Sequence, residues 1–345
     1  MKPQTIIKRW RELLVGQNHA IDTIMPYINR FSANLHLEGR PVANIFLVGP
    51  TGTGKTKTPE SLAEVLHGSE KNVLRIDCGA YSLEHEVAKL IGAPPGYLGH
   101  RETPAILSQK RINELATEKC KLSIVIWDEI EKASSSMWKL ILGIMDKAEV
   151  PLGDGSITNF ENCINFFTSN LGAEKMWKAL NGSFGFHGAL SAEDSSTGNT
   201  IDCIGRRSVE KGFSPEFYNR IDETISYSPL THLQLVEIAN IELNKLNHHI
   251  ASRLTEAAFQ IVFQKAVLVH FANLGNDPKY GARYLKRSIE HFLFDPLCIQ
   301  FLNGAIPPNS LICVSVGDNK LIWTVEPIVM APVVAPIKAT ASRKT

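Results

Sequence analysis

The chain has 345 residues, of which 44% are hydrophobic and 21% are charged, as is typical of a globular protein. Its 36 Lys and Arg residues balance its 35 Asp and Glu residues, so the overall charge does not indicate a nucleic-acid partner. No apolar run approaches the roughly 18 residues that span a bilayer, and no signal-peptide core follows Met1, so we expect a soluble, cytoplasmic protein with no membrane partner.

Six cysteines are scattered along the chain, and none forms the Cys-x-x-Cys pair that is typical of zinc sites. Several lie within apolar runs, as Cys163 does in Cys-Ile-Asn-Phe-Phe. This pattern favours reduced thiols in a cytosolic core over a metal site.

The first part of the chain alternates helical patterns with short apolar runs. Residues 1–40 carry an apolar stripe at helical spacing, and a further helix is expected to end at about His67. Buried strands are predicted at 44–48, 73–77, 123–128 and 163–168. Strands that alternate with helices predict an α/β fold, with a parallel sheet covered by helices on both faces.

The second part has a different composition. Residues 181–200 are rich in Gly, Ser, Asn and Thr, which predicts a surface loop. Beyond Pro229, helices are predicted at 231–250, 254–272 and 281–302, and a closing β-hairpin at 310–316 and 320–325. We therefore predict a large α/β domain over 1–228, a small, mostly helical lid domain over 229–326, and a disordered or partner-bound Pro/Ala/Val tail over 327–345.

A phosphate-binding pattern, Gly-x-x-x-x-Gly-Lys-Thr, occupies residues 49–56. It follows a predicted strand and opens a predicted helix, which is the context that gives the motif its meaning. Glycines let backbone N–H groups face the phosphates, and the helix N-terminus adds a positive end. Lys55 is expected to reach the β- and γ-phosphates of ATP, and the Thr56 hydroxyl to hold Mg²⁺. The residues expected to contact ATP here are Thr51, Gly52, Thr53, Gly54, Lys55 and Thr56.

Two carboxylates, Asp128 and Glu129, follow the predicted strand at 123–128. Ligands of parallel sheets bind beyond the carboxyl ends of the strands, so Asp128 is expected beside the phosphate loop, where it orders Mg²⁺. Glu129 can then polarise the attacking water. A solvated acidic turn is the alternative interpretation, which the phosphate loop upstream disfavours.

Asn170 follows the strand at 163–168 and could hydrogen-bond the water or the γ-phosphate. It could equally cap a helix that begins near Gly172. Arg220 could stabilise the transition state at a neighbouring subunit's ATP, or form a surface pair with Asp222. Arg283 opens a later helix and could close onto the γ-phosphate of its own subunit, or remain solvated.

These motifs together resemble the second ATPase module of Clp-type AAA+ protein unfoldases and disaggregases, over the span from Val15 to about Val325. The matching segments are Val15-Gly-Gln, Gly49 to Thr56, Gly92-Ala-Pro-Pro-Gly-Tyr-Leu-Gly, Trp127-Asp-Glu-Ile-Glu-Lys-Ala, Thr168-Ser-Asn-Leu-Gly, Phe213 to Asp222 and Tyr280-Gly-Ala-Arg. The resemblance implies an AAA+ ATPase. It also implies Val15 and Gly16 near the adenine, Asn170 as the first sensor, Arg220 as an arginine finger in trans, and Arg283 as the second sensor.

The resemblance also implies that Tyr97 lies on a pore loop that grips a threaded polypeptide. An aromatic ring grips any chain through non-directional apolar contact, which suits a tolerant motor. An ordinary Pro-Pro-Gly turn is the alternative. This chain departs from the family after Tyr97, where His100-Arg-Glu-Thr-Pro replaces the usual acidic residues and paired glycines.

Phe184-Gly185-Phe186 lies where peptidase-docking members of the family carry an aliphatic-Gly-aromatic or aliphatic-Gly-Leu tripeptide. A mobile apolar tripeptide could plug a pocket on a ring peptidase, or it could fold back on its own domain.

Two functions follow from these observations. The first is a homo-hexameric, ATP-driven unfoldase or remodeller that acts on polypeptides with ATP and Mg²⁺. The second is a nucleotide-dependent assembly switch or scaffold that threads nothing. A nucleic-acid motor is disfavoured, since no basic channel stands out.

Overall fold

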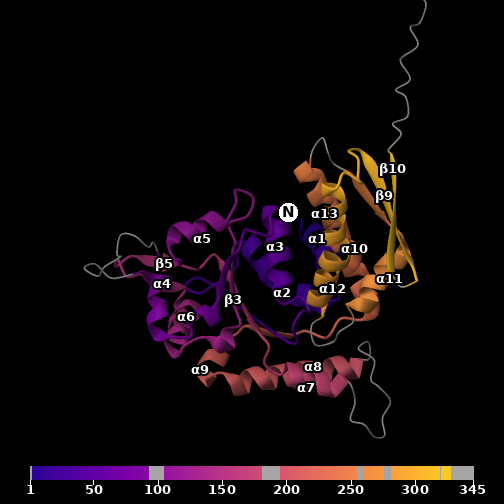
Figure 1. The fold of residues 1–345 in the computed structure, drawn as a ribbon. Helices are drawn as coiled ribbons and strands as arrows, with labels where there is room; N and C mark the ends of the chain where they lie inside the picture. Colours follow the sequence, from indigo (N-terminus) through magenta and orange to yellow (C-terminus); the bar gives the residue numbers. More distant parts are fainter. Residues whose placement is uncertain are drawn as a thin grey trace, which may run out of the picture. The chain divides into compact units, whose positions relative to one another are not determined.

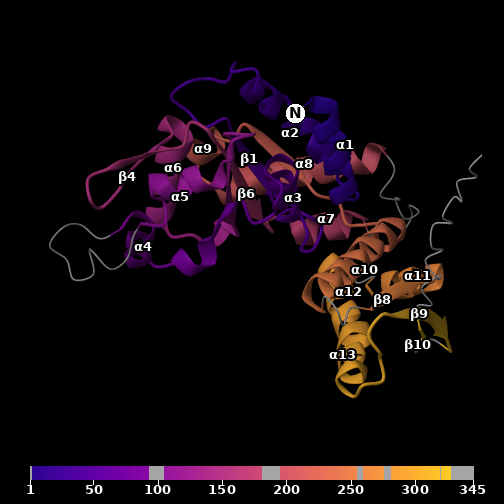
Figure 2. The same ribbon diagram turned by 90° about the horizontal axis from the view of Figure 1, so that it is seen from above.

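The computed structural model describes residues 2–92, 105–180, 195–254, 259–275, 281–318 and 320–327 (Figures 1 and 2). Packing divides the chain into two compact units. The first comprises Met1–Ile238 and Gly275–Leu285, and the second comprises Ala239–Leu274 and Lys286–Thr345. The packing thus assigns residues 229–238 and 275–285 to the first unit, whereas the boundary that the sequence predicts lies at 229.

The first unit is built on a five-stranded sheet with the order β2-β3-β6-β1-β7, in which every neighbouring pair is parallel. Its strands are β1 Ala43–Val48, β2 Leu74–Asp77, β3 Ser123–Asp128, β6 Cys163–Ser169 and β7 Glu223–Ser226. Four of these were predicted to within about a residue at each end, and β7 was missed. A separate two-stranded antiparallel ribbon pairs β4 Glu149–Pro151 with β5 Ile157–Asn159.

The side chains of the central strands alternate between two apolar layers. One layer contains Phe46, Trp127 and Phe167, and helices α6 to α9 contribute to it. The other contains Ile45 and Phe166, and helices α1 to α3 contribute to it. Every residue of β1, β3 and β6 is buried, because helices cover both faces. The predicted α/β fold is therefore confirmed (Figure 2).

The α-helices of this unit are α1 Pro3–Leu13, α2 Asn18–Ser32, α3 Lys57–His67, α4 Ala88–Ile91, α5 Gln109–Leu115, α6 Ser135–Lys147, α7 Ala173–Leu180, α8 Ser195–Gly212 and α9 Pro215–Tyr218. Short 3₁₀ turns lie at Cys78–Tyr81, Glu84–Val87 and Ile130–Lys132. Two helices begin in the first unit and continue into the second: α10 His232–Leu254 and α12 Ala282–Ile289.

The second unit combines helices with a three-stranded sheet of order β10-β9-β8. The strands of this sheet are β8 Gln260–Phe263, β9 Ser310–Gly317 and β10 Lys320–Pro327. The helices that lie wholly within this unit are α11 Lys265–Leu274 and α13 Asp295–Leu302, and a π-helical turn at Glu290–Phe294 precedes α13. Strands β9 and β10 pair antiparallel, as the predicted hairpin requires.

The helix predicted over 254–272 was correct only from Lys265 onward, where α11 begins, because β8 lies earlier in that range and pairs parallel with β9. The β8 sequence Gln-Ile-Val-Phe suits an extended strand, and it buries Ile261. The Asn247 side chain holds the backbone of Ile261 from both sides, since Nδ2 donates to the carbonyl oxygen at 2.7 Å and Oδ1 accepts from the N–H at 3.0 Å. Tertiary packing therefore overrides the helical pattern at this position.

Across the described ranges, we find no helix whose length and apolar character would allow it to cross a bilayer.

Candidate nucleotide site

The phosphate loop leaves β1 at Val48 and enters α3 at Lys57. Gly49 lies so close to the backbone after β7 that a Cβ there would meet the carbonyl oxygen of Tyr227 at 2.7 Å. Gly54 has a φ of 105°, which L side chains rarely adopt. Both positions therefore require glycine, and the loop turns tightly over the end of the sheet.

Lys55 is only 7% exposed and folds over its own loop. Its ammonium group donates to the carbonyl oxygens of Gly49 at 2.6 Å and Pro50 at 2.7 Å. Burial is the main cause that lowers the pKa of Lys55 to about 8; Glu131 opposes this shift, and the positive charge of Arg283 contributes to it. A desolvated ammonium group at this point is suited to bind an anion.

Asp128 ends β3 beside this loop and is held from two sides. Its Oδ2 accepts from the Arg75 guanidinium, at 2.5 Å from Nη2 and 3.1 Å from Nε. Its Oδ1 accepts from the Thr168 hydroxyl on β6. Asp128 is 8% exposed, and these two partners fix the orientation of its carboxylate.

Glu129 follows with a φ of 54°, in the left-handed region, which turns its side chain away from the strand direction. Its N–H donates to the Thr168 hydroxyl at 3.1 Å, and its Oε2 lies 2.5 Å from Lys132 Nζ. The Thr168 hydroxyl therefore contacts both the Asp128 carboxylate and the main chain of Glu129, while Lys132 pairs with the Glu129 side chain. The sequence analysis missed Arg75 and Thr168 as site residues, although Thr168 opens the polar tip Thr-Ser-Asn.

Asn170 follows β6 and reaches the phosphate loop. Its Oδ1 accepts from Lys55 Nζ at 3.0 Å and lies 3.4 Å from Thr51 Oγ1. Its N–H donates to Glu131 Oε1 at 3.1 Å. These contacts bring the Asn170 side chain to the phosphate loop, where the phosphate-sensing prediction requires it. Glu131, which the sequence analysis also missed, thus supports Asn170 and acts on the charge of Lys55.

The structure brings two further segments that carry predicted residues close to this loop. The N–H of Ala282 donates to the Gly52 carbonyl oxygen at 3.2 Å, which places the start of α12, and with it Arg283, beside the loop. Gly16 has a φ of 80° and is covered by the Gln234 amide. Next to it, Gln17 is 1% exposed and donates to the Thr53 carbonyl oxygen at 3.1 Å, so the segment that contains Val15 is joined to the loop.

Arg220 lies at the other edge of the sheet, where the strands begin. Its carbonyl oxygen accepts from the side chain of Asn44 on β1 at 3.2 Å. Its Nε lies 2.9 Å from Asp146 Oδ1, although the N–H does not point at that oxygen. The alternative pairing with Asp222 is wrong, because the Asp222 carboxylate is taken by Arg40 and by the Asn44 N–H.

Tyr97, Tyr280 and the Phe184-Gly185-Phe186 segment lie outside the described residues, as does the tail beyond Pro327. The pore and docking roles of these residues therefore stay predictions.

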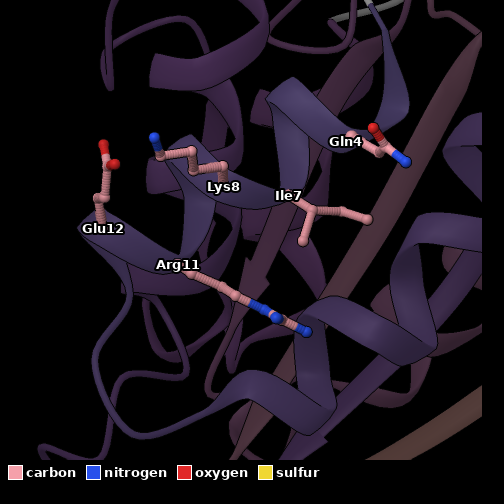
Figure 3. Close-up of a pocket in the computed structure, with 5 residues that line it drawn as sticks. All are labelled: Gln4, Ile7, Lys8, Arg11 and Glu12. Atoms are coloured by element: carbon pink, nitrogen blue, oxygen red, sulfur yellow. The ribbon is translucent and has the colours of Figure 1, made fainter.

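Two surface hollows contain none of the predicted site residues. One, of about 490 Å³, lies along α1 and is lined by Gln4, Ile7, Lys8, Arg11 and Glu12 (Figure 3). The other, of about 500 Å³, lies where β3 and β6 begin, and Gln109, Asn113, Asn159 and Lys121 are among its lining residues. Within the described ranges, no group of three or more His, Cys, Asp or Glu side chains could bind a metal ion.

The residues present fit a nucleoside triphosphate with Mg²⁺. The loop offers a crowded glycine turn, a buried ammonium group and the start of α3, all suited to phosphates. Thr56 at the start of α3 and Asp128 supply a hydroxyl and a carboxylate oxygen, which Mg²⁺ prefers. A parallel sheet with this loop, a strand-end Asp-Glu pair and a polar Asn on the neighbouring strand defines the class of AAA+ ATPases.

The comparisons agree with that class. Residues 40–224 match the AAA domain of the Cdc48 subfamily, and residues 230–314 match the C-terminal D2-small domain of ClpB. The chain therefore belongs to the AAA domain family. The succession of these two domains confirms the resemblance to the second module of Clp-type proteins.

Individual relatives show the same relationship. The chain is 34% identical to the chaperone protein ClpB of Lactococcus lactis subsp. cremoris (strain MG1363). The similarity extends over 326 residues, which are 94% of this chain and 35% of that protein. It is 33% identical over 308 residues to ClpB of Rhizobium meliloti (strain 1021), covering 89% of this chain and 33% of that one. The chain thus spans about a third of the length of these curated relatives.

A solved structure described as "Closed State CryoEM Reconstruction of Hsp104:ATPyS and FITC casein" is also similar. Its TM-score is 0.76 at 25% identity, over 94% of this chain and 52% of that chain.

Proposed function

We propose that this chain hydrolyses ATP in a ring of like subunits and uses the energy to remodel polypeptides. The ClpB relatives are named as chaperones, and the Hsp104 structure was determined with an ATP analogue and casein, which supports this class of activity. A homo-hexamer, a cytoplasmic location and threading by Tyr97 belong to the same proposal.

The residues of the site divide the work of hydrolysis. Backbone N–H groups of residues 51–54 and the Lys55 ammonium group bind the phosphates of ATP. Thr56 and Asp128 would hold Mg²⁺, which supplies positive charge to the phosphate oxygens when bound. Glu129 accepts the proton of the attacking water, and Asn170 orients that water or the γ-phosphate. Arg283 adds a second positive charge beside Lys55.

One observation carries the proposal that subunits cooperate. Arg220 is bound near the start of β1, whereas the phosphate loop follows the end of the same strand. A guanidinium at that edge lies at the opposite end of the strand from its own phosphate loop, so it is suited to a neighbour's nucleotide. In that position it stabilises the negative charge that develops on the transferred phosphoryl group.

The test removes the Arg220 charge. We expect Arg220→Ala to keep its affinity for ATP, because the phosphate loop is intact, and to lose turnover by about 10³-fold or more, as removal of an arginine finger does. Light scattering with saturating ATP and Mg²⁺ follows assembly, and phosphate release follows turnover. Arg206→Ala, which only breaks an exposed pair with Asp202, is the control.

Full turnover of Arg220→Ala, or a chain that stays monomeric with saturating ATP and Mg²⁺, would overturn the proposal.

The alternative, an assembly switch that threads nothing, is distinguished by Tyr97→Ala. Survival of partner remodelling in that variant, with ATP binding still essential, supports the switch. Docking of a ring peptidase on Phe184-Gly185-Phe186 is a further part of the proposal, tested by deletion of that tripeptide.

A further inference from the structure

Two asparagines lie side by side inside the central sheet, among apolar side chains. Asn44 on β1 and Asn165 on β6 are register partners, and both are fully buried. Asn165 Nδ2 donates to Asn44 Oδ1 at 2.9 Å, while Asn165 Oδ1 accepts from Trp127 Nε1 at 3.3 Å. A buried amide destabilises the fold unless it is hydrogen-bonded, so the partners of these side chains account for their presence.

The remaining donors of Asn44 reach the segment that carries Arg220. Its Nδ2 donates to the Arg220 carbonyl oxygen at 3.2 Å and to the Met145 carbonyl oxygen at 3.3 Å. Met145 directly precedes Asp146, whose carboxylate lies 2.9 Å from Arg220 Nε. One amide group therefore fixes the main chain of the arginine and the helix end that carries its acidic neighbour.

The main chain of Asn44 holds the same segment a second time. Its N–H donates to Asp222 Oδ2 at 2.7 Å, and its carbonyl oxygen accepts from the Asp222 N–H at 2.9 Å. Asp222 also pairs with Arg40. Residues 220 and 222 are thus both attached to a single residue of a buried central strand, which leaves the backbone of Arg220 little freedom to shift.

We propose that Asn44 is a positioning residue for Arg220, which holds the guanidinium where a neighbouring subunit's nucleotide requires it. This inference rests on the proposed function, in which Arg220 acts in trans. The stabilisation of transition-state charge depends on accurate placement, and a misplacement of about 1 Å can cost on the order of 10²-fold in rate.

The chain offers a matched pair of variants to test this role. Asn44→Leu and Asn165→Leu each replace a fully buried amide on the same face and at the same register by an apolar side chain of similar size. Each breaks the Asn44–Asn165 hydrogen bond, but only Asn44→Leu loses the contact with the Arg220 carbonyl oxygen. If Asn44→Leu does not fold, Asn44→Ser replaces it, since the shorter hydroxyl cannot make the same contacts.

We expect both variants to lower the melting temperature and to keep their affinity for ATP. Only the Asn44 variant should lose turnover, by roughly 10- to 100-fold, which is the effect expected of a misplaced catalytic group. Equal loss of turnover in the Asn44 and Asn165 variants, or unchanged turnover in both, overturns the positioning role.

A mixing experiment separates this inference from the proposed function. An Asn44→Leu subunit keeps its own nucleotide site but presents Arg220 poorly, whereas a Glu129→Gln subunit presents Arg220 well but does not hydrolyse ATP. Mixed assemblies should therefore turn over ATP faster than either variant alone. Arg220→Ala mixed with Glu129→Gln is the reference. If ATP turnover rises in the reference mixture but not in the mixture with Asn44→Leu, the role of Asn44 is overturned. If turnover does not rise in the reference mixture, action of Arg220 in trans is overturned, and the inference about Asn44 with it.

Discussion

The two edges of the central sheet are built by different chemistry. At the edge where the strands end, Lys55, Asp128, Glu129 and Asn170 place charged and polar groups around a glycine turn. At the edge where they begin, Arg220 is attached through main-chain contacts to one buried asparagine. The first edge is organised around a ligand and the second around a neighbouring segment of the same chain. Motifs therefore identify the first edge. At the second edge the sequence names Arg220, but only the three-dimensional contacts reveal its attachment to Asn44.

The largest expected effect concerns the edge that binds the ligand. Glu129→Gln keeps the shape of the side chain and removes its basicity, so we expect ATP to bind and subunits to assemble while turnover falls by about 10²- to 10⁴-fold. Phosphate release and nucleotide binding measure the two quantities separately. Glu174→Gln, which affects only an exposed pair with Lys178, is the control. Normal turnover of Glu129→Gln would show that another group activates the water.

A smaller effect tests how the start of α12 supports this edge. Gly281 has a φ of 51°, and a Cβ there would meet the Gly52 carbonyl oxygen at 2.8 Å. We expect Gly281→Ala to displace Ala282 and Arg283 from the loop and to lower ATP affinity by up to about 10-fold, since a hydrogen bond contributes about 0.5–1.5 kcal/mol. Isothermal titration measures the affinity.

Gly304→Ala is the matched control for that variant, because Gly304 also has a positive φ, 73°, but has nothing within 4 Å of its Cβ position. Each variant carries the backbone cost of a left-handed alanine, about 1–2 kcal/mol. Only Gly281→Ala should change ATP affinity. The same affinity in both variants would mean that the contact between Ala282 and Gly52 does not support nucleotide binding.

The smallest effect on activity tests whether the two edges are independent. Trp127 precedes the acidic pair on β3 and donates to Asn165, so it touches both regions. Trp127→Phe leaves Asn165 Oδ1 without this donor. We expect the free energy of unfolding to fall by about 1–3 kcal/mol while ATP turnover stays near that of the unaltered chain. Denaturant unfolding and phosphate release measure the two effects, and a large loss of turnover would show that the edges are coupled through this indole.

The sequence predicts the strands that are continuously apolar, because β1, β3 and β6 are covered by helices on both faces. It misses β7, whose Glu-Thr-Ile-Ser carries no apolar run and whose Thr224 and Ser226 are buried by the fold. It also takes β8 for helix, because the hydrogen bonds that hold this strand come from Asn247 in α10 and leave no mark in the strand's own sequence.

The residues of the candidate site also divide into those that a local pattern reveals and those that only the fold reveals. Phosphate-binding chemistry fixes residue types at fixed spacings, so the loop and the acidic pair can be recognised from the sequence. Arg75 acts through a contact that the fold creates, and nothing in its local sequence marks it. Glu131 lies within the matching segment that begins at Trp127, but its contact with the Asn170 N–H is visible only in the fold. Asn44 is a polar residue within an apolar strand, and its role depends on partners more than a hundred residues away.

Strand β7 connects the two edges directly. Arg220 precedes it by three residues, and Tyr227 follows it and packs against Gly49. A strand of four residues is about 13 Å long and resists stretching. In the ring that we propose, this short strand links the loop expected to bind the triphosphate with the arginine expected to act on a neighbour's nucleotide. Its length therefore sets the distance between the two sites within one subunit.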